Sequence, residues 1–226
     1  MKTILFQGDS ITDCGRDRKA AEGKFSFKKL IGKSEVLGNG YPLLVTRELE
    51  KANPGKYTYI NRGVSGDRIL DVYARIVKDI IKIKPDYMSL LIGVNDVWHE
   101  LLCDNGTTAK RYEKVYDIVI SELKEEFPEL KIMILEPFVL EGNATKSVPE
   151  DPDRYNKFRK GVEEMASIAK AIAQKHNLKF VPLQAKFDEE AKKFSAAEMA
   201  SDGVHPTPRG HELIRNEWLK AFGEIA

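Results

Sequence analysis

Short polar segments far apart in the chain contain the residue types that acyl transfer from an ester needs. Ser10 lies in the segment Gly8-Asp9-Ser10, directly after the apolar run Ile4-Leu5-Phe6. A serine hydroxyl becomes an effective nucleophile when a neighbouring base takes its proton. His205 can be that base, because an imidazole titrates near neutral pH. Asp202, on the same segment as His205, can accept a hydrogen bond from the ring and hold its tautomer. These three residues are the predicted catalytic set.

The same chemistry also needs donors for the negative oxygen that forms when the serine attacks. The candidates for this oxyanion hole are the backbone N–H of Ser10, the backbone N–H of Gly63 and the side-chain amide of Asn95. Gly63 has no Cβ, which would let its backbone approach a substrate closely. One such donor typically contributes about 3–4 kcal/mol to lowering the barrier.

Each of these segments, taken alone, also has a purely structural interpretation. Ser10 could cap a helix, and Asn-Asp pairs are common in turns. Asp9 and Asp96 are expected to hold their turns by accepting hydrogen bonds from backbone N–H groups. Asp9 and Trp98 are also candidate residues of the substrate pocket. For Trp98, a place in the core or in an interface is an equal alternative, since large aromatic side chains dominate both settings.

The elements that must position these residues alternate between strands and helices. Strands are expected at 4–6, 57–60, 87–92, 131–135 and 179–181, and helices at 41–52, 69–83, 110–127, 154–176, 185–194 and 209–222. This alternation predicts an α/β fold with a parallel sheet covered on both faces. Right-handed crossovers then give a three-layer α/β/α sandwich of about five strands. Open sheets of this kind bind ligands at the carboxyl ends of their strands, where the polar segments should meet.

Two long polar loops, 12–40 and 137–153, should lie at the same edge of the sheet and form the rim of a pocket. Within the first, residues 24–33 combine lysines with apolar side chains. This stretch is interpreted as a surface loop or lid, with a site for a polyanion as the alternative.

Composition argues against nucleic-acid binding, a metal site and a membrane span. The 226 residues have a formal net charge of +1 and no basic footprint for nucleic acid. They are expected to form one domain, 1–226. Cys14 and Cys103 are the two cysteines, far apart and without metal-ligand spacing. No metal or cofactor is expected. The chain has no signal-peptide pattern and no stretch long enough to span a membrane. A cytoplasmic protein is therefore predicted.

Together the segments resemble the SGNH-hydrolase family, also called the GDSL lipases and esterases. The resemblance rests on Gly8-Asp-Ser-Ile-Thr-Asp13, Gly63, Gly93-Val-Asn95 and Asp202-Gly-Val-His205-Pro206, in family order over nearly the whole chain. It implies a flavodoxin-like sandwich with Ser10 as nucleophile and with Asp202 and His205 as its partners. It also implies an oxyanion hole made by Ser10, Gly63 and Asn95.

Further motifs are similar to those of the intracellular acetylxylan esterases of this family. They are Asp13-Cys-Gly15, Leu37-Gly-Asn-Gly-Tyr41, Gly93-Val-Asn-Asp-Val-Trp98 and Pro137-Phe-x-x-Glu141-Gly142. This resemblance implies a small-molecule substrate, an acetylated xylo-oligosaccharide, and assembly into a homo-oligomer. Two alternatives stay open. One is a short-chain thioesterase, lysophospholipase or acetylhydrolase that acts on lipid-like esters. The other is a protein that binds a carbohydrate without turnover.

Overall fold

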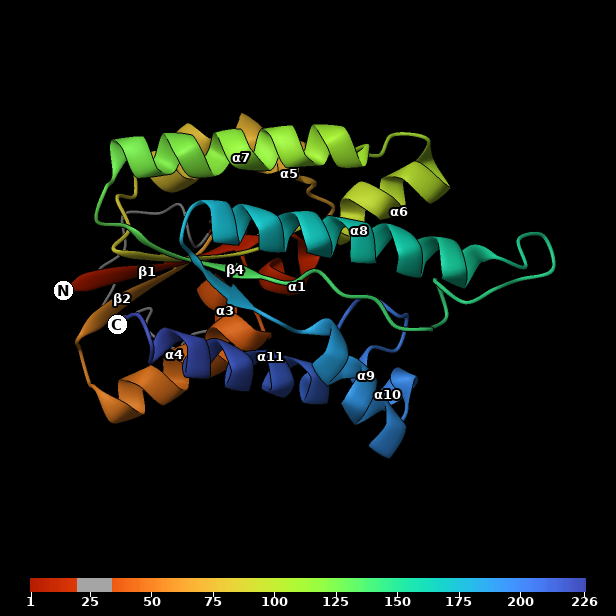
Figure 1. Ribbon diagram of the computed structural model, residues 1–226. Coiled ribbons are helices and arrows are strands. Elements are labelled where there is room, and N and C mark those ends of the chain that lie inside the picture. Colours follow the sequence, from red (N-terminus) through yellow and green to blue (C-terminus); the bar gives the residue numbers. More distant parts are fainter. Residues whose placement is uncertain (20–33) are drawn as a thin grey trace.

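Five parallel strands form the sheet at the centre of the molecule (Figure 1). The computed structural model describes residues 1–19 and 34–226, so the stretch 24–33 and much of the loop 12–40 lie outside the described residues. The strands are β1 (Lys2–Gly8), β2 (Tyr57–Asn61), β3 (Tyr87–Leu91), β4 (Lys131–Leu135) and β5 (Lys179–Val181). Their order is β2-β1-β3-β4-β5, and all neighbours pair in parallel, which confirms the predicted sheet.

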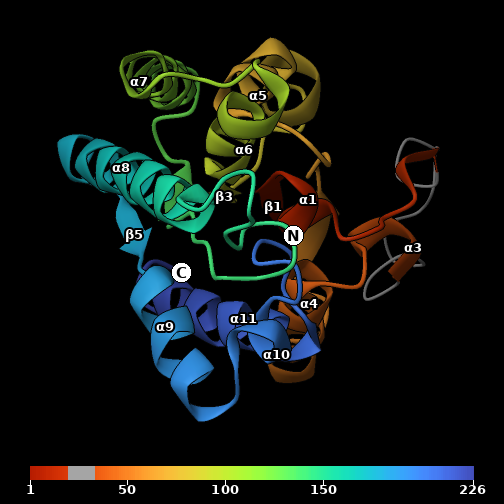
Figure 2. The same cartoon turned by 90° about the vertical axis from the view of Figure 1, so that its right-hand side faces the viewer.

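Helices cover both faces of this sheet. One layer contains α5 (Ile69–Ala74), α6 (Val94–Cys103), α7 (Ala109–Glu126) and α8 (Arg154–Lys175), and the other contains α4 (Tyr41–Ala52), α9 (Gln184–Lys193), α10 (Ala196–Met199) and α11 (Pro208–Phe222). Two further short helices are α1 (Ser10–Asp13), which follows β1, and α3 (Ser34–Leu37), which lies beside α4 (Figure 1 and Figure 2). The expected three-layer α/β/α sandwich is thus confirmed.

The last helix is fixed to the middle of the sheet by stacked aromatic rings. Trp218 is fully buried, and its ring centroid lies 5.4 Å from that of Phe6 in β1. One helical turn later Phe222 stacks on Trp218 at 4.8 Å. Phe222 also meets Tyr57 and Tyr87 edge-on, at the starts of β2 and β3. The C-terminal helix and its preceding loop are therefore held against the strand that leads to Ser10.

Apart from the four-residue helices α1, α3 and α10, which were not predicted, two regions differ from the predicted helices. The helix expected at 69–83 is interrupted: α5 ends at Ala74, and a π-helical turn, η2 (Val77–Ile81), follows. Between them Arg75 leaves helical geometry, and its side chain bonds to groups on β1, on the segment after β2 and on η2. Helix α6 was not predicted, because Asn95-Asp96 was interpreted as a turn.

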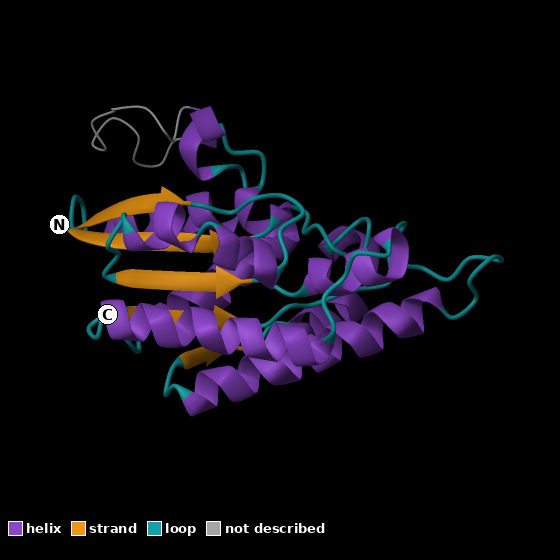
Figure 3. Cartoon of the chain, turned by 90° about the horizontal axis from the view of Figure 1, so that it is seen from above, coloured by secondary structure: helices purple, strands orange, loops and turns teal. Residues whose placement is uncertain are grey.

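The polar segments gather at the carboxyl edge of the sheet. The strands all point toward this edge in Figure 3, and the loop between β4 and α8 extends beyond it. Seen from that side, α1, the loop after β4 and the segment before α11 lie close together near the centre (Figure 2). The sheet order reverses between β1 and β3, so Ser10 lies at the topological switch point. Among residues 1–19 and 34–226, no helix is long and apolar enough to span a membrane.

Candidate active site

The structure brings Ser10, His205 and Asp202 into one hydrogen-bonded series. The Ser10 Oγ lies 2.8 Å from the His205 Nε2, although the two residues are 195 positions apart in the chain. The His205 Nδ1 lies 2.6 Å from the Asp202 Oδ2. This geometry lets the ring accept the serine proton on one nitrogen while the other nitrogen is held by a carboxylate.

Ser10 is pushed out of the sheet by a sharp strand-to-helix turn. It is the first residue of α1, and Asp9 caps that helix by accepting the Ile11 N–H at 2.9 Å. Gly8 has φ +157°, and a Cβ there would lie 2.3 Å from the Leu91 carbonyl oxygen and 2.5 Å from the Thr12 Oγ1. Only glycine fits that space, which explains why the chain can turn directly at the end of β1.

Asp202 is arranged to stay ionised. Its Oδ1 accepts the backbone N–H groups of Val204 at 2.9 Å and His205 at 2.7 Å. Burial by itself would raise the Asp202 pKa. The hydrogen bonds from the His205 ring and from these N–H groups outweigh burial and lower that pKa to about 2. In return, the hydrogen bond that Asp202 accepts from the His205 ring raises the pKa of His205 above its ordinary value. The carboxylate therefore favours the protonated form of the His205 ring.

Asn95 lies in the first turn of α6, directly after Gly93, which has φ +136°. Its amide Nδ2 donates to the Asp67 carbonyl oxygen at 3.1 Å. An amide nitrogen has a second N–H, so Asn95 keeps one donor for a substrate oxygen. The bond to Asp67 fixes the direction in which that donor points.

Gly63 does not have the free N–H that the sequence prediction requires. Its N–H donates to the Asn61 Oδ1 at 2.8 Å, and its carbonyl accepts the Arg16 Nε at 3.0 Å. A Cβ on Gly63 would lie 2.4 Å from the backbone N of Asp13. The missing side chain therefore serves close packing against α1. The assignment of Gly63 as an oxyanion donor is corrected on this geometry.

Gly66, in the same segment, has the properties that were expected of Gly63. It has φ +86°, a Cβ there would meet nothing within 4 Å, and its N–H has no acceptor in the described part of the chain. Val64 donates to the Gly8 carbonyl at 3.0 Å, and the Asp67 carbonyl accepts from Asn95. Hydrogen bonds on both sides of Gly66 therefore fix its position: Val64 bonds to the end of β1, and Asp67 bonds to Asn95. The segment contains two glycines, and the direction of the backbone N–H decides between them.

The segment around Gly66 is held by one arginine. Arg75 donates to the Asp67 Oδ2 at 2.7 Å, the Arg62 carbonyl at 2.9 Å and the Gln7 Oε1 at 3.0 Å. It also pairs with Asp79 across η2. The guanidinium thus connects the segment after β2 to β1 and to the interrupted helix. No pattern in the sequence identified this arginine.

Two carboxyl groups in the segments that contain Ser10 and Asn95 are buried, those of Asp9 and Asp96. Asp9 is only 1 % exposed, and the expectation that it lines the substrate pocket is corrected on this burial. Asp96 accepts the Ile69 N–H with both oxygens at 3.3 Å. Burial raises the pKa of Asp9 and of Asp96 to about 7 in each case. The expected role of both side chains in holding backbone N–H groups is confirmed.

Trp98 packs on Phe158 of α8, with the ring centroids 5.5 Å apart, and is partly buried. This contact agrees with the core alternative for Trp98. Its place in a substrate pocket stays a prediction. Residues 1–19 and 34–226 contain no group of three or more side chains that could hold a metal ion.

A serine, a histidine and an ionised aspartate in series at the carboxyl edge of an α/β/α sandwich define a serine ester hydrolase. Comparison with known proteins agrees. The model of the GDSL-like lipase/acylhydrolase family matches residues 6–213, and the chain belongs to this family.

Similar proteins span almost the whole chain. An acetylxylan esterase of Geobacillus stearothermophilus is 34% identical, over 97% of this chain and 93% of the relative. A structure from Parabacteroides merdae, assigned as a GDSL-like lipase, superposes with a TM-score of 0.87 at 34% identity, covering 98% of this chain and 95% of the other. The crystal structure of Axe2, an acetylxylan esterase from the same Geobacillus species, gives 0.78 at 32% identity, covering 98% and 94%. Two further Axe2 structures are described as catalytic mutants, one with a serine and one with an aspartate replaced by alanine.

Proposed function

We propose that this esterase removes acetyl groups from carbohydrates, with acetylated xylo-oligosaccharides as substrates, through an acetyl-Ser10 intermediate. The observation that carries the proposal is the series from Ser10 through His205 to Asp202. The acetyl and xylo-oligosaccharide parts are supported by the similar Geobacillus enzymes, one of which is described as an acetyl-xylooligosaccharide esterase.

Formation of the intermediate follows from the positions of the side chains. The Ser10 Oγ attacks the acetyl carbonyl carbon while the His205 Nε2 takes the serine proton. The oxygen that becomes negative is stabilised by the N–H groups of Ser10 and Gly66 and by the free N–H of the Asn95 amide. The bond to the sugar oxygen then breaks, and His205 returns its proton to that oxygen. Acetyl-Ser10 remains, and the deacetylated sugar leaves.

Hydrolysis repeats these steps with water as the nucleophile. His205 takes a proton from water, the resulting hydroxide attacks acetyl-Ser10, and the tetrahedral oxygen is held by the same donors. When the intermediate collapses, His205 returns the proton to the Ser10 Oγ and acetic acid leaves, losing its own proton to water to become acetate. Asp202 stays ionised throughout, because its pKa is about 2.

The test is mass spectrometry of acetylated xylo-oligosaccharides and manno-oligosaccharides before and after incubation with the enzyme. The wild type should remove acetyl groups from the xylo-oligosaccharides, and Ser10→Ala should leave them intact. Ser167→Ala is the control: its hydroxyl donates to a carbonyl of its own helix, and this variant should act like the wild type. If neither sugar loses acetyl groups while a simple aryl acetate is cleaved, the carbohydrate assignment fails and the esterase remains.

A second candidate function is hydrolysis of lipid-like esters, thioesters included, because the matching family also contains lipases and the Parabacteroides protein is assigned as one. A series of aryl esters of increasing acyl length separates the two. A carbohydrate acetyl esterase should lose activity steeply beyond the shortest acyl groups. Equal or greater rates on long acyl groups would favour the lipid-like substrate.

Assembly and location complete the proposal. We infer a homo-oligomer inside the cell. Exposed apolar side chains on α5, η2, α6 and α7 are candidate residues for its interface: Tyr73, Val77, Leu101, Leu102 and Ile118. Sedimentation analysis of the purified protein should show a species larger than one chain. A monomer at all concentrations would exclude the assembly without affecting the proposed reaction.

A further inference from the structure

The segment that carries the catalytic base is bonded to a second loop, which follows β4. We call residues 200–206 the base loop and residues 137–146 the support loop. Three backbone N–H groups of the support loop donate to carbonyls of the base loop. Leu140 donates to Gly203 at 2.8 Å, Asn143 to Ser201 at 3.3 Å and Ala144 to Asp202 at 3.0 Å. The support loop therefore fixes the backbone of Asp202 and of its two neighbours in the chain.

The two loops touch at two glycines. A Cβ on Gly142 would lie 2.1 Å from the backbone N of Gly203 and 2.3 Å from the carbonyl carbon of Asp202. A Cβ on Gly203 would lie 2.5 Å from the Leu140 carbonyl oxygen. Gly203 also has φ +96°, where other residues are strained. Because backbone lies directly on backbone, a shift of the support loop moves the base loop with it.

The Thr145 side chain makes two hydrogen bonds to the backbone of its own loop. It is fully buried, its Oγ1 donates to the Leu140 carbonyl at 2.6 Å, and it accepts the Gly142 N–H at 2.9 Å. The same Oγ1 would be 2.1 Å from a Cβ on Gly203, so the hydroxyl lies directly beneath the base loop. One hydroxyl thus fixes the two residues of the support loop that meet Gly203.

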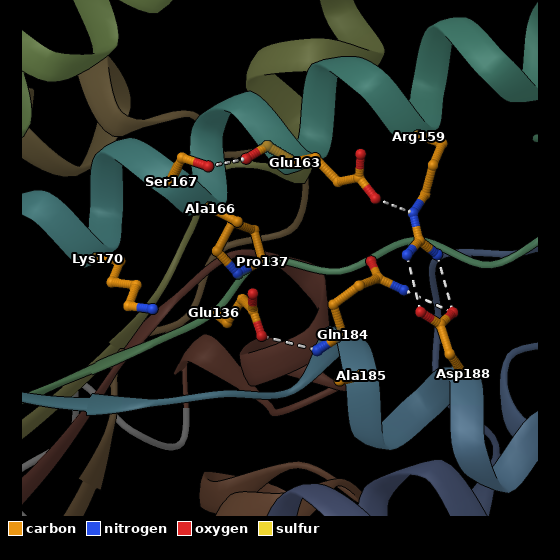
Figure 4. A pocket seen from close by; sticks show the side chains of 10 residues that line it. All are labelled: Glu136, Pro137, Arg159, Glu163, Ala166, Ser167, Lys170, Gln184, Ala185 and Asp188. Atoms are coloured by element: carbon orange, nitrogen blue, oxygen red, sulfur yellow. Dashed lines mark hydrogen bonds and ion pairs between the residues drawn. The ribbon is translucent and has the colours of Figure 1, made fainter.

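The other end of the support loop is held by a side-chain amide. The Gln184 Oε1 accepts the Val139 N–H at 2.9 Å, and the Gln184 Nε2 donates to the Val139 carbonyl at 3.1 Å. Gln184 donates in turn to Asp188, which Arg159 of α8 grips with two hydrogen bonds at 2.8 and 2.7 Å (Figure 4). The support loop is therefore tied to α9 and α8, which carry no catalytic residue.

We propose that Thr145 is a positioning residue for the reaction: its hydroxyl holds the support loop in the conformation that directs Asp202 at the His205 ring. Thr145 acts through backbone and touches no substrate. The inference rests on the proposed role of Asp202 and His205 as the base of the esterase. Catalytic groups must be held within a fraction of an ångström of their productive geometry. Loss of the Thr145 hydroxyl bonds should therefore lower kcat.

The test compares Thr145→Val with Thr46→Val in the full chain. Thr46 is also fully buried, and its Oγ1 donates to a carbonyl, that of Pro42, at 2.8 Å within α4. Both changes remove one buried hydroxyl and keep the side-chain shape. Hydrolysis of an aryl acetate is measured against pH, with the number of active sites counted by a phosphonate that reacts with the serine. If the wild type neither hydrolyses the ester nor reacts with the phosphonate, the proposed function fails before the positioning role is tested.

Thr145→Val should lower kcat per active site by roughly tenfold and leave KM little changed. Its activity should also rise at lower pH than that of the wild type, because a loosened Asp202 no longer raises the His205 pKa. Thr46→Val should lose thermal stability only, and Thr145→Ser, which keeps the hydroxyl, should restore kcat. The proposal is overturned if Thr145→Val matches Thr46→Val in kcat and pH profile. It is also overturned if Thr145→Ser is as impaired as Thr145→Val.

Should Thr145→Val fail to fold, Gln184→Met tests the same loop from its other end. This change removes both bonds to Val139 and keeps the length of the side chain. A fall in kcat per active site with the same displacement of the pH profile supports positioning through the loop. An unchanged profile in Gln184→Met overturns it.

Discussion

The two sides of the active site are held by different kinds of interaction. On the oxyanion side, the segment after β2 is tied to the sheet by the Arg75 guanidinium and its carboxylates, and two further carboxyl groups on this side are buried. On the base side, the support loop is joined to the base loop by backbone N–H groups and is held by the neutral side chains of Thr145 and Gln184. The Arg159–Asp188 ion pair lies one step further away, bonded to Gln184. Asp202 is thus the one ionised group placed against the His205 ring by these loops.

This difference follows from what each side must do. The donors on the oxyanion side belong to backbone and an amide, whose function does not depend on a proton, so charged groups nearby can fix them. The base side depends on the pKa of His205, which any neighbouring charge would move. A neutral support leaves Asp202 to set that pKa. The following predictions test this contrast, from the largest expected effect to the smallest.

Asp202→Asn should have the largest effect. By analogy with the same change in other serine–histidine–aspartate enzymes, kcat should fall by about 10⁴ with the fold retained, because the ring loses its fixed tautomer. Asp117→Asn is the matched control. Asp117 also pairs with a histidine, His176, at 2.7 Å, but on the α7–α8 surface. Kinetics at neutral pH measure both variants, and equal activities would contradict the assigned role of Asp202.

Arg75→Met should mainly destabilise the fold. It removes the arginine partner of Asp67 and leaves Asp79 with only its longer contact to Arg62 at 3.6 Å, and breaking a buried ion pair on one side typically costs about 3–5 kcal/mol. Urea unfolding measures the loss. Arg159→Met is the comparison on the base side, where the Asp188 pair is more exposed and the loss should be smaller. A loss in Arg159→Met as large as that in Arg75→Met would remove the contrast between the two sides.

Asn95→Ala should reduce kcat by about 10²–10³ with little change in KM, because it removes a donor to the oxyanion. The pH profile should keep its shape, since no charge near His205 changes. Asn156→Ala, at an exposed amide that bonds to Asp153, is the control and should act like the wild type. An effect on KM alone would place Asn95 in ground-state binding instead.

The two glycines of the segment after β2 should respond in opposite ways. Gly63→Ala places a Cβ against the backbone of α1 and should cost about 1–3 kcal/mol of stability. Gly66→Ala has open space but φ +86°, where a side chain strains the backbone that carries the proposed donor N–H. Compared with Gly63→Ala, it should show the larger loss of kcat and the smaller loss of stability. Thermal melts and kinetics on both variants decide the matter. A kcat defect confined to Gly63→Ala would restore Gly63 as the donor.

Much of this site could be predicted because its chemistry is local in sequence. Ser10, Asn95 and the Asp202–His205 pair each lie at a strand end or in one loop, and alternation of strands and helices implies that such ends meet. The choice of glycine could not be predicted, since the packing, the backbone φ and the direction of the N–H that distinguish Gly63 from Gly66 are set by the fold and leave no mark in the local sequence. Thr145, Gln184 and Arg75 were also missed. Each acts through partners far away in the chain, and none belongs to a local pattern.

The smallest expected effect is that of Asp9, on the oxyanion side, on the pKa of His205, on the base side. Among the charges that raise the His205 pKa, that of Asp202 dominates and that of Asp9 is the smallest. Protonated His205 cannot take the serine proton, so activity rises with pH as the ring deprotonates. Because the His205 pKa is raised, this rise should lie above pH 6.5 in the wild type. Asp9→Asn keeps an oxygen for the Ile11 N–H but removes the charge, so the rise should move slightly to lower pH.

Asp96→Asn is the matched control, because Asp96 is equally buried and has a similar pKa but is not among the charges that act on His205. Profiles of kcat/KM against pH, which report on the free enzyme, measure both variants. A displacement in Asp9→Asn alone would show that the buried Asp9 carboxyl adjusts the base across the site. Equal displacement of the pH profile in both variants would mean that charges on the oxyanion side act on His205 without distinction. The contrast between the two sides would then depend only on the stability difference between Arg75→Met and Arg159→Met.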